Sequence, residues 1–166
     1  MPIKLAQYGI SHAHASGKVD AMKLNADVEF CGIYEPDDEV RKELGNNRIY
    51  QDVNWFDSKE EMLGDKSIVG IAVEGAVKDN LKFAREVIQN DKHVWLDKPA
   101  GTDMEDFYDI LLMAKEKGLL LQMGYMFRYN AGFELLFDML KNGNLGNLFS
   151  VRGRMSTNIS IDRRRA

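Results

Sequence analysis

The stretch HVWLDKPAGT, residues 93–102, is an apolar run that ends on an acid, a lysine and a proline. A strand buried inside a parallel sheet is expected to be almost continuously apolar, and ligands of open α/β sheets bind beyond the carboxyl ends of such strands. We therefore expect Lys98 to project into a crevice, where its ammonium group can reach a bound hydroxyl or carbonyl. Asp97 would keep that group charged, and Pro99 would fix the backbone that follows. The alternative is a surface salt bridge in a loop, which contributes little to stability.

Apolar runs alternate with segments of helical periodicity along the whole chain. The sequence predicts strands at 3–9, 28–35, 67–75, 93–97 and 119–127, with a weak strand and a short helix within 48–64. The helical segments are 14–25, 37–45, 79–90, 102–118 and 131–143. Connections of helix length between strands favour right-handed crossovers. The fold class predicted from this order is α/β, a doubly wound parallel sheet of the Rossmann type.

The helix at 102–118 carries the clearest end signals. Thr102 and Glu105 fit a capping box, and Gly118 is a typical stop signal. Its apolar stripe, expected to face the core, comprises Met104, Phe107, Leu111 and Ala114.

Composition and charge exclude several functional classes. The chain has 166 residues, of which 45% are hydrophobic and 29% charged, as in a soluble globular domain. Its net charge of −4 and scattered basic residues argue against a nucleic-acid surface. No stretch approaches membrane-spanning length and no signal-peptide pattern is present, so we expect a cytoplasmic protein without a membrane partner. The single cysteine, Cys31, is expected to be a buried structural thiol.

The turn YGISHAHASG follows the first strand, where a dinucleotide-binding fold has its glycine-rich turn. Gly9 occupies the first glycine position of G-x-G-x-x-G, whereas Ser11 and His14 stand at the second and third. The turn nevertheless follows a strand and opens a helix, as phosphate binding at a helix N-terminus requires. We therefore expect Gly9, Ile10, Ser11 and His12 to contribute to a dinucleotide site.

Glu35 ends the second strand. An acid at that position can hydrogen-bond the ribose hydroxyls of the adenosine and would repel a 2′-phosphate, which favours NAD over NADP. The alternative is that Glu35 merely begins a Glu-Pro turn.

His12 and His14 are separated by one residue, and both imidazoles could ligate zinc. A zinc site needs a third and usually a fourth ligand. The remaining histidine, His93, is expected at the opposite end of its strand, and Cys31 in the interior. We therefore predict no metal site and expect the imidazoles to line the turn, where they can donate to phosphate or substrate.

KHVWLDKPAG, together with QMGYMFRYN and NGNLGNLFSVRG, resembles the oxidoreductase family named for glucose–fructose oxidoreductase, inositol dehydrogenase and the rhizopine-catabolism protein (Gfo/Idh/MocA). That family carries Glu-Lys-Pro where this chain has Asp97, Lys98 and Pro99. The resemblance implies a dehydrogenase that transfers hydride between NAD(P) and a hydroxyl-bearing carbon of a sugar, polyol or related compound. It also implies that Lys98 contacts nicotinamide and substrate, that Asp97 orients it, and that Pro99 lines the cofactor site after a cis peptide bond.

The resemblance assigns further residues less directly. The family's Thr-Pro-Asn-x-x-His after the fourth strand is replaced here by the segment from Gly75 to Asn80, which keeps only a polar group at Asn80. Glu74 would supply polar contact to the cofactor instead. Tyr125 and Arg128 would face the interdomain cleft and contact substrate. For Arg128, a carboxylate across that interface is an equal alternative.

The resemblance also predicts how the chain is divided. Residues 1–130 would form the dinucleotide-binding domain, and residues 131–166 a connecting helix and the first strand, 148–157, of a truncated α+β substrate domain. The chain alone would then be inactive, and any homo-oligomer would form through the absent part. Two alternatives remain open: an NAD-dependent glycoside-cleaving enzyme, and a non-catalytic dinucleotide-binding relative. The kept Lys98 argues against the second, and the altered loop after the fourth strand argues for it.

Overall fold

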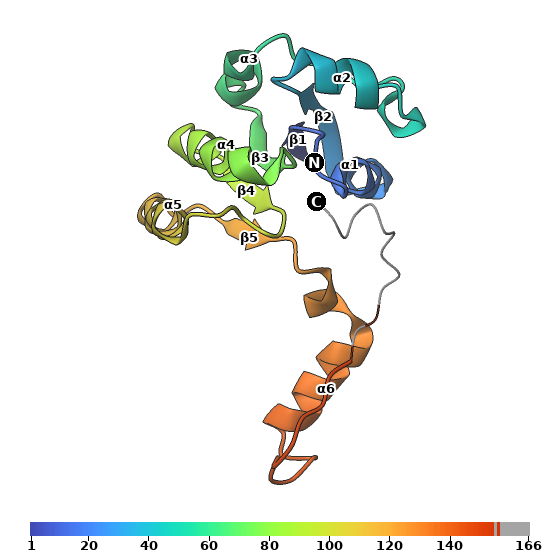
Figure 1. The fold of residues 1–166 in the computed structure, drawn as a ribbon, viewed down its shortest axis with the longest axis vertical. Coiled ribbons are helices and arrows are strands. Elements are labelled where there is room, and N and C mark those ends of the chain that lie inside the picture. The colour runs from blue at the N-terminus through green and yellow to red at the C-terminus, as the bar shows by residue number, and fades with distance from the viewer. Residues whose placement is uncertain (155, 157–166) are drawn as a thin grey trace. The chain divides into compact units, whose positions relative to one another are not determined.

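The computed structural model describes residues 1–154 and 156, and its chain divides into two units. The first unit, Met1–Tyr125, contains a parallel five-stranded sheet with the strand order β2-β1-β3-β4-β5 (Figure 1). Its strands are β1 (Ile3–Tyr8), β2 (Val28–Tyr34), β3 (Ile68–Val73), β4 (His93–Leu96) and β5 (Leu121–Met123). Its helices are α1 (Ala15–Leu24), α2 (Asp38–Leu44), η1 (Arg48–Tyr50), α3 (Lys59–Gly64), α4 (Val77–Gln89) and α5 (Met104–Glu116). This arrangement confirms the predicted Rossmann-type α/β fold.

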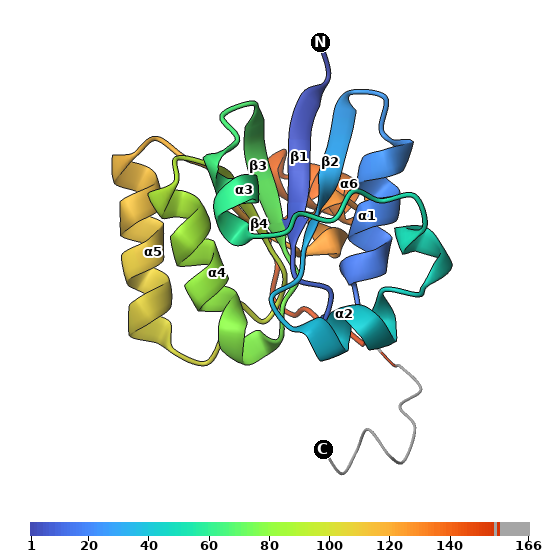
Figure 2. The ribbon, with the colours of Figure 1, turned by 90° about the horizontal axis from the view of Figure 1, so that it is seen from above.

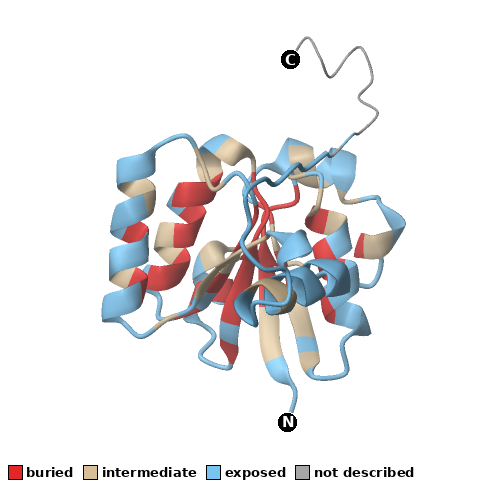
Figure 3. Ribbon diagram, turned by 90° about the horizontal axis from the view of Figure 1, so that it is seen from below, coloured by how far each residue is buried: buried red, intermediate tan, exposed pale blue. Residues whose placement is uncertain are grey.

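The sheet is covered on both faces, as an all-parallel sheet requires. Residues of α3, α4 and α5 pack with β1, β3 and β4 in one hydrophobic cluster, and residues of α1 and η1 pack against the opposite face in a second. Figure 2 shows α4 and α5 on one side of the strands and α1 on the other. Buried residues concentrate on the strands and on the helix sides that face them (Figure 3).

Successive residues of β3 show how the two faces are divided. Ile71 and Val73 belong to the cluster under α4, whereas Ala72 between them belongs to the cluster under α1. This alternation follows from the twofold repeat of a strand. In α4 the buried positions include Leu81, Ala84, Val87 and Ile88, the stripe expected from helical spacing.

Two details of α5 differ from the prediction. Its N-cap is Asp103, whose side chain accepts the backbone N–H of Glu105 and of Asp106, so the capping box at Thr102 was wrong by one residue. An aspartate is a stronger N-cap than a threonine and outcompetes its neighbour. The buried positions of α5 are Ile110 and Ala114, while Met104 and Leu111 are exposed.

The weak strand predicted within 48–64 is reduced to one bridge between Ile33 and Trp55. The backbone of Ile33 donates to Asn54 O at 2.9 Å and accepts from Phe56 N at 2.9 Å. The pairing stops there because Ser58 already caps α3, with its side chain accepting from the N–H of Glu61. The predicted short helix is α3.

The second unit begins at Met126 and contains η2 (Met126–Tyr129) and α6 (Ala131–Lys141). The side chain of Asn130 caps α6 by accepting from the backbone N–H of Gly132 and of Phe133. The strand predicted at 148–157 does not form over its described residues, 148–154 and 156; residues 155 and 157 lie outside the described part. The division into a cofactor domain, 1–130, and the start of a substrate domain, 131–166, stays a prediction.

Two expectations from composition can be checked in the described residues. Cys31 is a free cysteine on β2 and is half-buried, not fully buried as expected, and this burial raises its pKa. Of the helices in residues 1–154 and 156, none combines the length and the apolar character that crossing a bilayer demands.

Candidate functional site

The register of the central strands brings polar residues together at the carboxyl edge of the sheet. The last strand pairs are Tyr8 with Val73 and Val73 with Leu96. The residues that follow these strand ends directly are Gly9, Glu74 and Asp97. They lie where β1 and β3 meet, which is the switch in strand order at which open α/β sheets bind ligands.

Gly9 begins the turn between β1 and α1 and could not be replaced without strain. Its φ of +88° lies in the region that favours glycine. A Cβ atom at this position would stand 2.6 Å from the backbone nitrogen of Gly75. The turn after β1 therefore packs directly against the turn after β3, which is the close approach expected of the first glycine in a dinucleotide-binding turn.

The remaining backbone N–H groups of this turn are divided between protein contacts and open positions. His12 donates its N–H to the carbonyl oxygen of Glu74 at 3.0 Å, so this donor is not available to a phosphate. The N–H groups of Ser11 and Ala13 make no hydrogen bond within the described residues. At the start of α1, His14 donates its N–H to Nδ1 of His12 at 3.3 Å and Ala15 donates to the carbonyl oxygen of His12 at 3.0 Å, so these two donors are also taken.

Beneath the turn, Lys18 forms a buried ion cluster with two carboxylates. Its ammonium group contacts Glu74 and lies 3.4 Å from Oδ2 of Asp97. The same nitrogen lies 4.5 Å from the ring centre of Trp95. Lys18 is 6% exposed and Glu74 is fully buried. Lys18 was not predicted as a site residue. It lies on the apolar stripe of α1 between Ala15 and Val19, and a lysine at such a position indicates a buried charge that needs a partner.

Both histidines of the turn point at these carboxylates. Nδ1 of His12 lies 3.2 Å from Oε2 of Glu74 and 3.7 Å from Oδ2 of Asp97. Nδ1 of His14 lies 3.1 Å from the same Oδ2 of Asp97. Burial decreases along this group from Asp97 to His14, whose side chain is 38% exposed. The cluster is therefore open on the side of His14.

The cluster perturbs the proton affinity of its members. Burial raises the pKa of Glu74 to about 7, although the Lys18 ammonium opposes this shift. Burial also opposes ionisation of Asp97, but Lys18, the backbone N–H of Lys98 and the histidines outweigh it and hold the Asp97 pKa below its ordinary value. Burial lowers the pKa of His12, against the pull of Asp97. Perturbed groups that gather in this way are typical of functional sites.

Lys98 comes after Asp97 beyond the end of β4, is exposed, and forms no ion pair with any described carboxylate. The expected pairing of its ammonium group with Asp97 was wrong. Oδ1 of Asp97 accepts a hydrogen bond from the backbone N–H of Lys98 at 2.5 Å. Oδ2 lies near the Lys18 ammonium and Nδ1 of both histidines. Asp97 therefore orients the backbone of Lys98 and not its side chain. The predicted cis peptide bond between Lys98 and Pro99 is confirmed.

Glu35 connects the end of β2 to the turn after β1. Its Oε2 accepts the backbone N–H of Ile10 at 2.6 Å and its Oε1 accepts that of Asp37 at 3.0 Å. The residue is 6% exposed, and burial raises its pKa despite these two hydrogen bonds. Each oxygen keeps a second lone pair, so the predicted contact with a ribose hydroxyl stays a prediction.

Asn80 lies under the turn after β3 and is fully buried. Neither its amide nitrogen nor its amide oxygen has a hydrogen-bond partner among the described residues. A Cβ atom at Gly75 would stand 3.2 Å from the Asn80 oxygen and 2.5 Å from the ring of Phe83. Buried amides are rarely left unpaired. The contact of Asn80 with the cofactor stays a prediction.

The two residues assigned to substrate lie in different units. Tyr125 ends the first unit and is 58% exposed, and Arg128 lies within η2 of the second unit and is exposed. Each offers a polar group to solvent. Their contact with substrate stays a prediction.

These residues fit a bound dinucleotide. Gly9 allows the close backbone approach, the open N–H groups of Ser11 and Ala13 can face phosphates, and Asn80 holds an unpaired amide. The N–H groups of Ile10, His12 and His14 already have acceptors within the chain, which are Oε2 of Glu35, the carbonyl oxygen of Glu74 and Nδ1 of His12.

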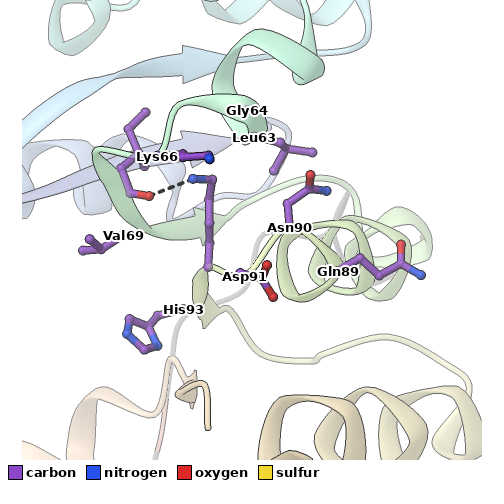
Figure 4. Close-up of a pocket in the computed structure, with 10 residues that line it drawn as sticks. Leu63, Gly64, Lys66, Val69, Gln89, Asn90, Asp91 and His93 are labelled. Carbon is purple, nitrogen blue, oxygen red and sulfur yellow. Dashed lines mark hydrogen bonds between the residues drawn. The ribbon is translucent and has the colours of Figure 1, made fainter. Parts of the chain in front are cut away.

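The opposite edge of the sheet has a separate pocket of about 520 Å³. It lies at the amino ends of β3 and β4, where Lys66, Asn90 and His93 surround it (Figure 4). Ligands of open α/β sheets bind at the other edge. The candidate site is therefore the cluster beside Lys98 and not this pocket.

Solved structures share this fold at low sequence identity. A 3-ketoreductase from Actinomadura kijaniata, in complex with NADP and TDP-benzene, has a TM-score of 0.70 and 20% identity over 86% of this chain and 43% of its own. An NAD-binding protein from Listeria innocua has a TM-score of 0.71 and 19% identity over 87% of this chain and 40% of its own.

Curated relatives include dehydrogenases of sugar-like compounds. Glucose-6-phosphate 3-dehydrogenase of Bacillus subtilis is 24% identical over 162 residues, which are 95% of this chain and 42% of that protein. Inositol 2-dehydrogenase of Salmonella typhimurium is 21% identical over 100 residues, which are 60% of this chain and 30% of that protein. The chain thus spans less than half the length of these relatives.

The family model described as the oxidoreductase family with an NAD-binding Rossmann fold (Gfo/Idh/MocA) matches residues 7–125. This match confirms the resemblance seen in the sequence and the expected cofactor at the level of NAD(P); the preference for NAD over NADP stays a prediction. The chain belongs to the Gfo/Idh/MocA oxidoreductase family, and residues 7–125 are its NAD(P)-binding Rossmann domain.

Proposed function

We propose that this chain is the cofactor-binding part of a dehydrogenase that acts on a hydroxyl-bearing carbon of a sugar, polyol or related compound, with Lys98 as its catalytic residue. The observation that carries this proposal is the place of Lys98. It follows β4 at the carboxyl edge, is exposed, and has no carboxylate partner among the described residues. Two relatives are named as dehydrogenases of glucose-6-phosphate and of inositol, and both compounds have hydroxyl-bearing carbons.

The role of Lys98 follows from its charge. When bound, NAD(P)⁺ would accept a hydride from the substrate carbon. The Lys98 ammonium donates a hydrogen bond to the hydroxyl oxygen and stabilises the negative charge that develops as the hydroxyl proton leaves to water. Asp97 holds the backbone nitrogen of Lys98 at 2.5 Å and so fixes where its side chain begins.

The cofactor would be held by the turn after β1 and by the loop after β3. The N–H groups of Ser11 and Ala13 would face the phosphates, and the unpaired amide of Asn80 would face the cofactor's polar groups. Glu35 places a carboxylate at the end of β2, where it would disfavour a 2′-phosphate. We therefore propose NAD as the preferred cofactor.

The test compares Lys98→Ala with the wild type in the complete protein that carries this chain. We expect turnover of a polyol or sugar panel to fall by about 10²- to 10⁴-fold, the usual contribution of a positioned proton donor, while the Kd for NAD stays within about threefold. Lys66→Ala, an exposed lysine at the opposite edge, is the matched control and should leave both unchanged. Unchanged turnover in Lys98→Ala would refute the proposal.

A second candidate is a relative that binds dinucleotide without catalysing net oxidation. The hydrogen bond from His12 N–H to Glu74 O favours it, because this turn has one phosphate donor fewer. NAD binding without NADH formation on any hydroxyl substrate would support it. Product release from a glycoside under those conditions would instead identify the NAD-dependent glycoside-cleaving alternative.

A further inference from the structure

We propose that His12, His14, Asp97 and Glu74 form a binding site for a divalent metal ion of the zinc class. The inference does not depend on the proposed dehydrogenase activity. It rests on donor atoms of His12, His14 and Asp97, which lie within 4.8 Å of one another at the carboxyl edge of the sheet. Oε2 of Glu74, 3.2 Å from Nδ1 of His12, is the candidate fourth ligand.

The spacing of these atoms is close to that of a tetrahedral site. Zinc holds nitrogen and oxygen ligands at about 2.0–2.2 Å, which sets neighbouring ligand atoms about 3.3 Å apart. Nδ1 of His12 lies 3.2 Å from Glu74 and 3.7 Å from Asp97, and Nδ1 of His14 lies 3.1 Å from Asp97. The donor atoms of His12, His14 and Asp97 all lie within 4.8 Å of one another. Small side-chain adjustments therefore suffice to surround an ion.

The backbone explains why these residues meet. His12 and His14 are one residue apart in a turn that the Gly9 conformation directs across the strand ends. The turn is fastened there by the hydrogen bond from His12 N–H to the carbonyl of Glu74. Asp97 directly follows the end of β4. Three separate chain segments thus supply the ligands, and each is anchored by the sheet.

The charges of the cluster leave a place for a cation. Glu74 presents Oε1 to Lys18 and Oε2 to His12, so the ammonium group and the imidazole lie on different sides of this carboxylate. At Asp97, Oδ2 lies 3.4 Å from the Lys18 ammonium and 3.1 Å from Nδ1 of His14, so an ion bound there would share this oxygen with Lys18. One ammonium cannot compensate two buried carboxylates, and with neutral imidazoles the ionised cluster carries one negative charge. A divalent ion on the histidine side would change the net charge of the cluster from −1 to +1 and would compensate both carboxylates.

The donor set selects the kind of metal. Two imidazoles with two carboxylate oxygens suit zinc, cobalt or nickel, whereas magnesium and calcium prefer oxygen ligands alone. The ion would enter from the side of His14, the most exposed of the four side chains. The sequence alone indicated only the two histidines. Glu74 and Asp97 lie far along the chain from them, and only the register of the strands places these carboxylates beside the histidines.

The test is binding of Zn²⁺ and Co²⁺ to the 166-residue chain, by calorimetry and by the visible absorption of tetrahedral Co²⁺, with Mg²⁺ as comparison. Removing a second-shell partner already costs about 10- to 100-fold in metal affinity, so loss of a ligand should cost at least about 100-fold. We expect that loss in His12→Gln and in His14→Gln. The matched control is His93→Gln, which changes the remaining histidine at the amino end of β4.

Circular dichroism of each variant establishes that it is folded, and both histidines are partly exposed, so the variants are expected to fold. The proposal is overturned if the wild type binds Co²⁺ no more tightly than the His12→Gln, His14→Gln double variant, or if His93→Gln weakens binding as much. Preference for Mg²⁺ over Zn²⁺ would also overturn it. None of these readouts uses hydride transfer, so failure here leaves the proposed function untouched.

Discussion

Two buried lysines lie at opposite edges of the same sheet. Lys92, 3% exposed, precedes β4 at the amino edge and donates to the backbone carbonyls of Asp65 at 2.6 Å and Ile68 at 2.8 Å. Lys18, 6% exposed, lies at the carboxyl edge and contacts the carboxylates of Glu74 and Asp97. Burial lowers the pKa of Lys92, and its acceptors cannot titrate.

The two lysines differ in whether their partners can titrate. Lys92 closes the loop before β3 by satisfying carbonyls, and the arrangement is complete within the chain. At the other edge the carboxylates are shared among Lys18 and two histidines, and the pKa of Glu74 is raised to about 7 by burial. A group that titrates near neutrality can respond to a ligand, a proton or a metal ion.

The largest effect is expected from Lys18→Met. Removing one partner of a buried ion cluster leaves uncompensated charge, and the cost is about 3–5 kcal/mol of unfolding free energy. The loss should be greatest near pH 8, where Glu74 is ionised in the folded state, and smaller near pH 5. Urea unfolding at both pH values measures it. A loss below about 1 kcal/mol at pH 8 would show that Lys18 does not compensate the carboxylates.

Glu74→Gln should change the pH dependence of stability. Because burial raises the pKa of Glu74 from 4.5 to about 7, its protonated form favours folding, and wild-type stability falls as pH rises through that window. The corresponding free energy is on the order of 3 kcal/mol. The variant should lack this fall, so the stability difference between the two proteins should grow from pH 4.5 to 8. Parallel stability curves would contradict the raised pKa.

Lys92→Met tests the amino edge. The substitution leaves two buried carbonyls without their donor, which costs about 1–3 kcal/mol. Since those acceptors do not titrate, thermal or urea unfolding should give the same loss at pH 5 and pH 8. A stability loss that changed strongly with pH would mean that Lys92, like Lys18, interacts with groups that titrate.

Asp91→Asn should have the smallest effect. Asp91 pairs with Lys117 at 2.6 Å beside the amino-edge pocket, but its side chain is 80% exposed, and such pairs contribute at most about 1 kcal/mol. Asparagine also tolerates the positive φ of this position, 59°. Added salt should reduce the loss further. Denaturation in low and high salt measures it, and a loss comparable to that of Lys92→Met would be unexpected.

Local patterns carried most of the fold prediction. The near-continuous apolar runs around Ile71 and Val94 indicate buried parallel strands, and the polar residues after them must then lie at the carboxyl edge. This reasoning placed Lys98 correctly, because its position depends only on where β4 ends. The weak strand predicted between residues 48 and 64 was wrong. Ser58 caps α3 there, and only one β-bridge, between Ile33 and Trp55, forms before it.

The partners of the site residues could not be predicted in the same way. Asp97 was paired with its sequence neighbour Lys98, whereas the fold pairs it with Lys18 and two histidines. Such contacts depend on the register of β1, β3 and β4 and on how the turn after Gly9 crosses them. A lysine on the apolar face of α1 was the one local sign of a buried acidic partner.

The most direct test of the carboxyl edge as the cofactor site is the thermal shift that NAD causes in this chain, with EDTA present. At NAD concentrations about 100 times the Kd, binding stabilises by about 2.7 kcal/mol, which raises the Tm. Ser11→Asp places a negative charge at the exposed mouth of the turn and should abolish the shift, while Ser11→Ala should keep it. An equal shift in Ser11→Asp, or none in the wild type, would contradict the account.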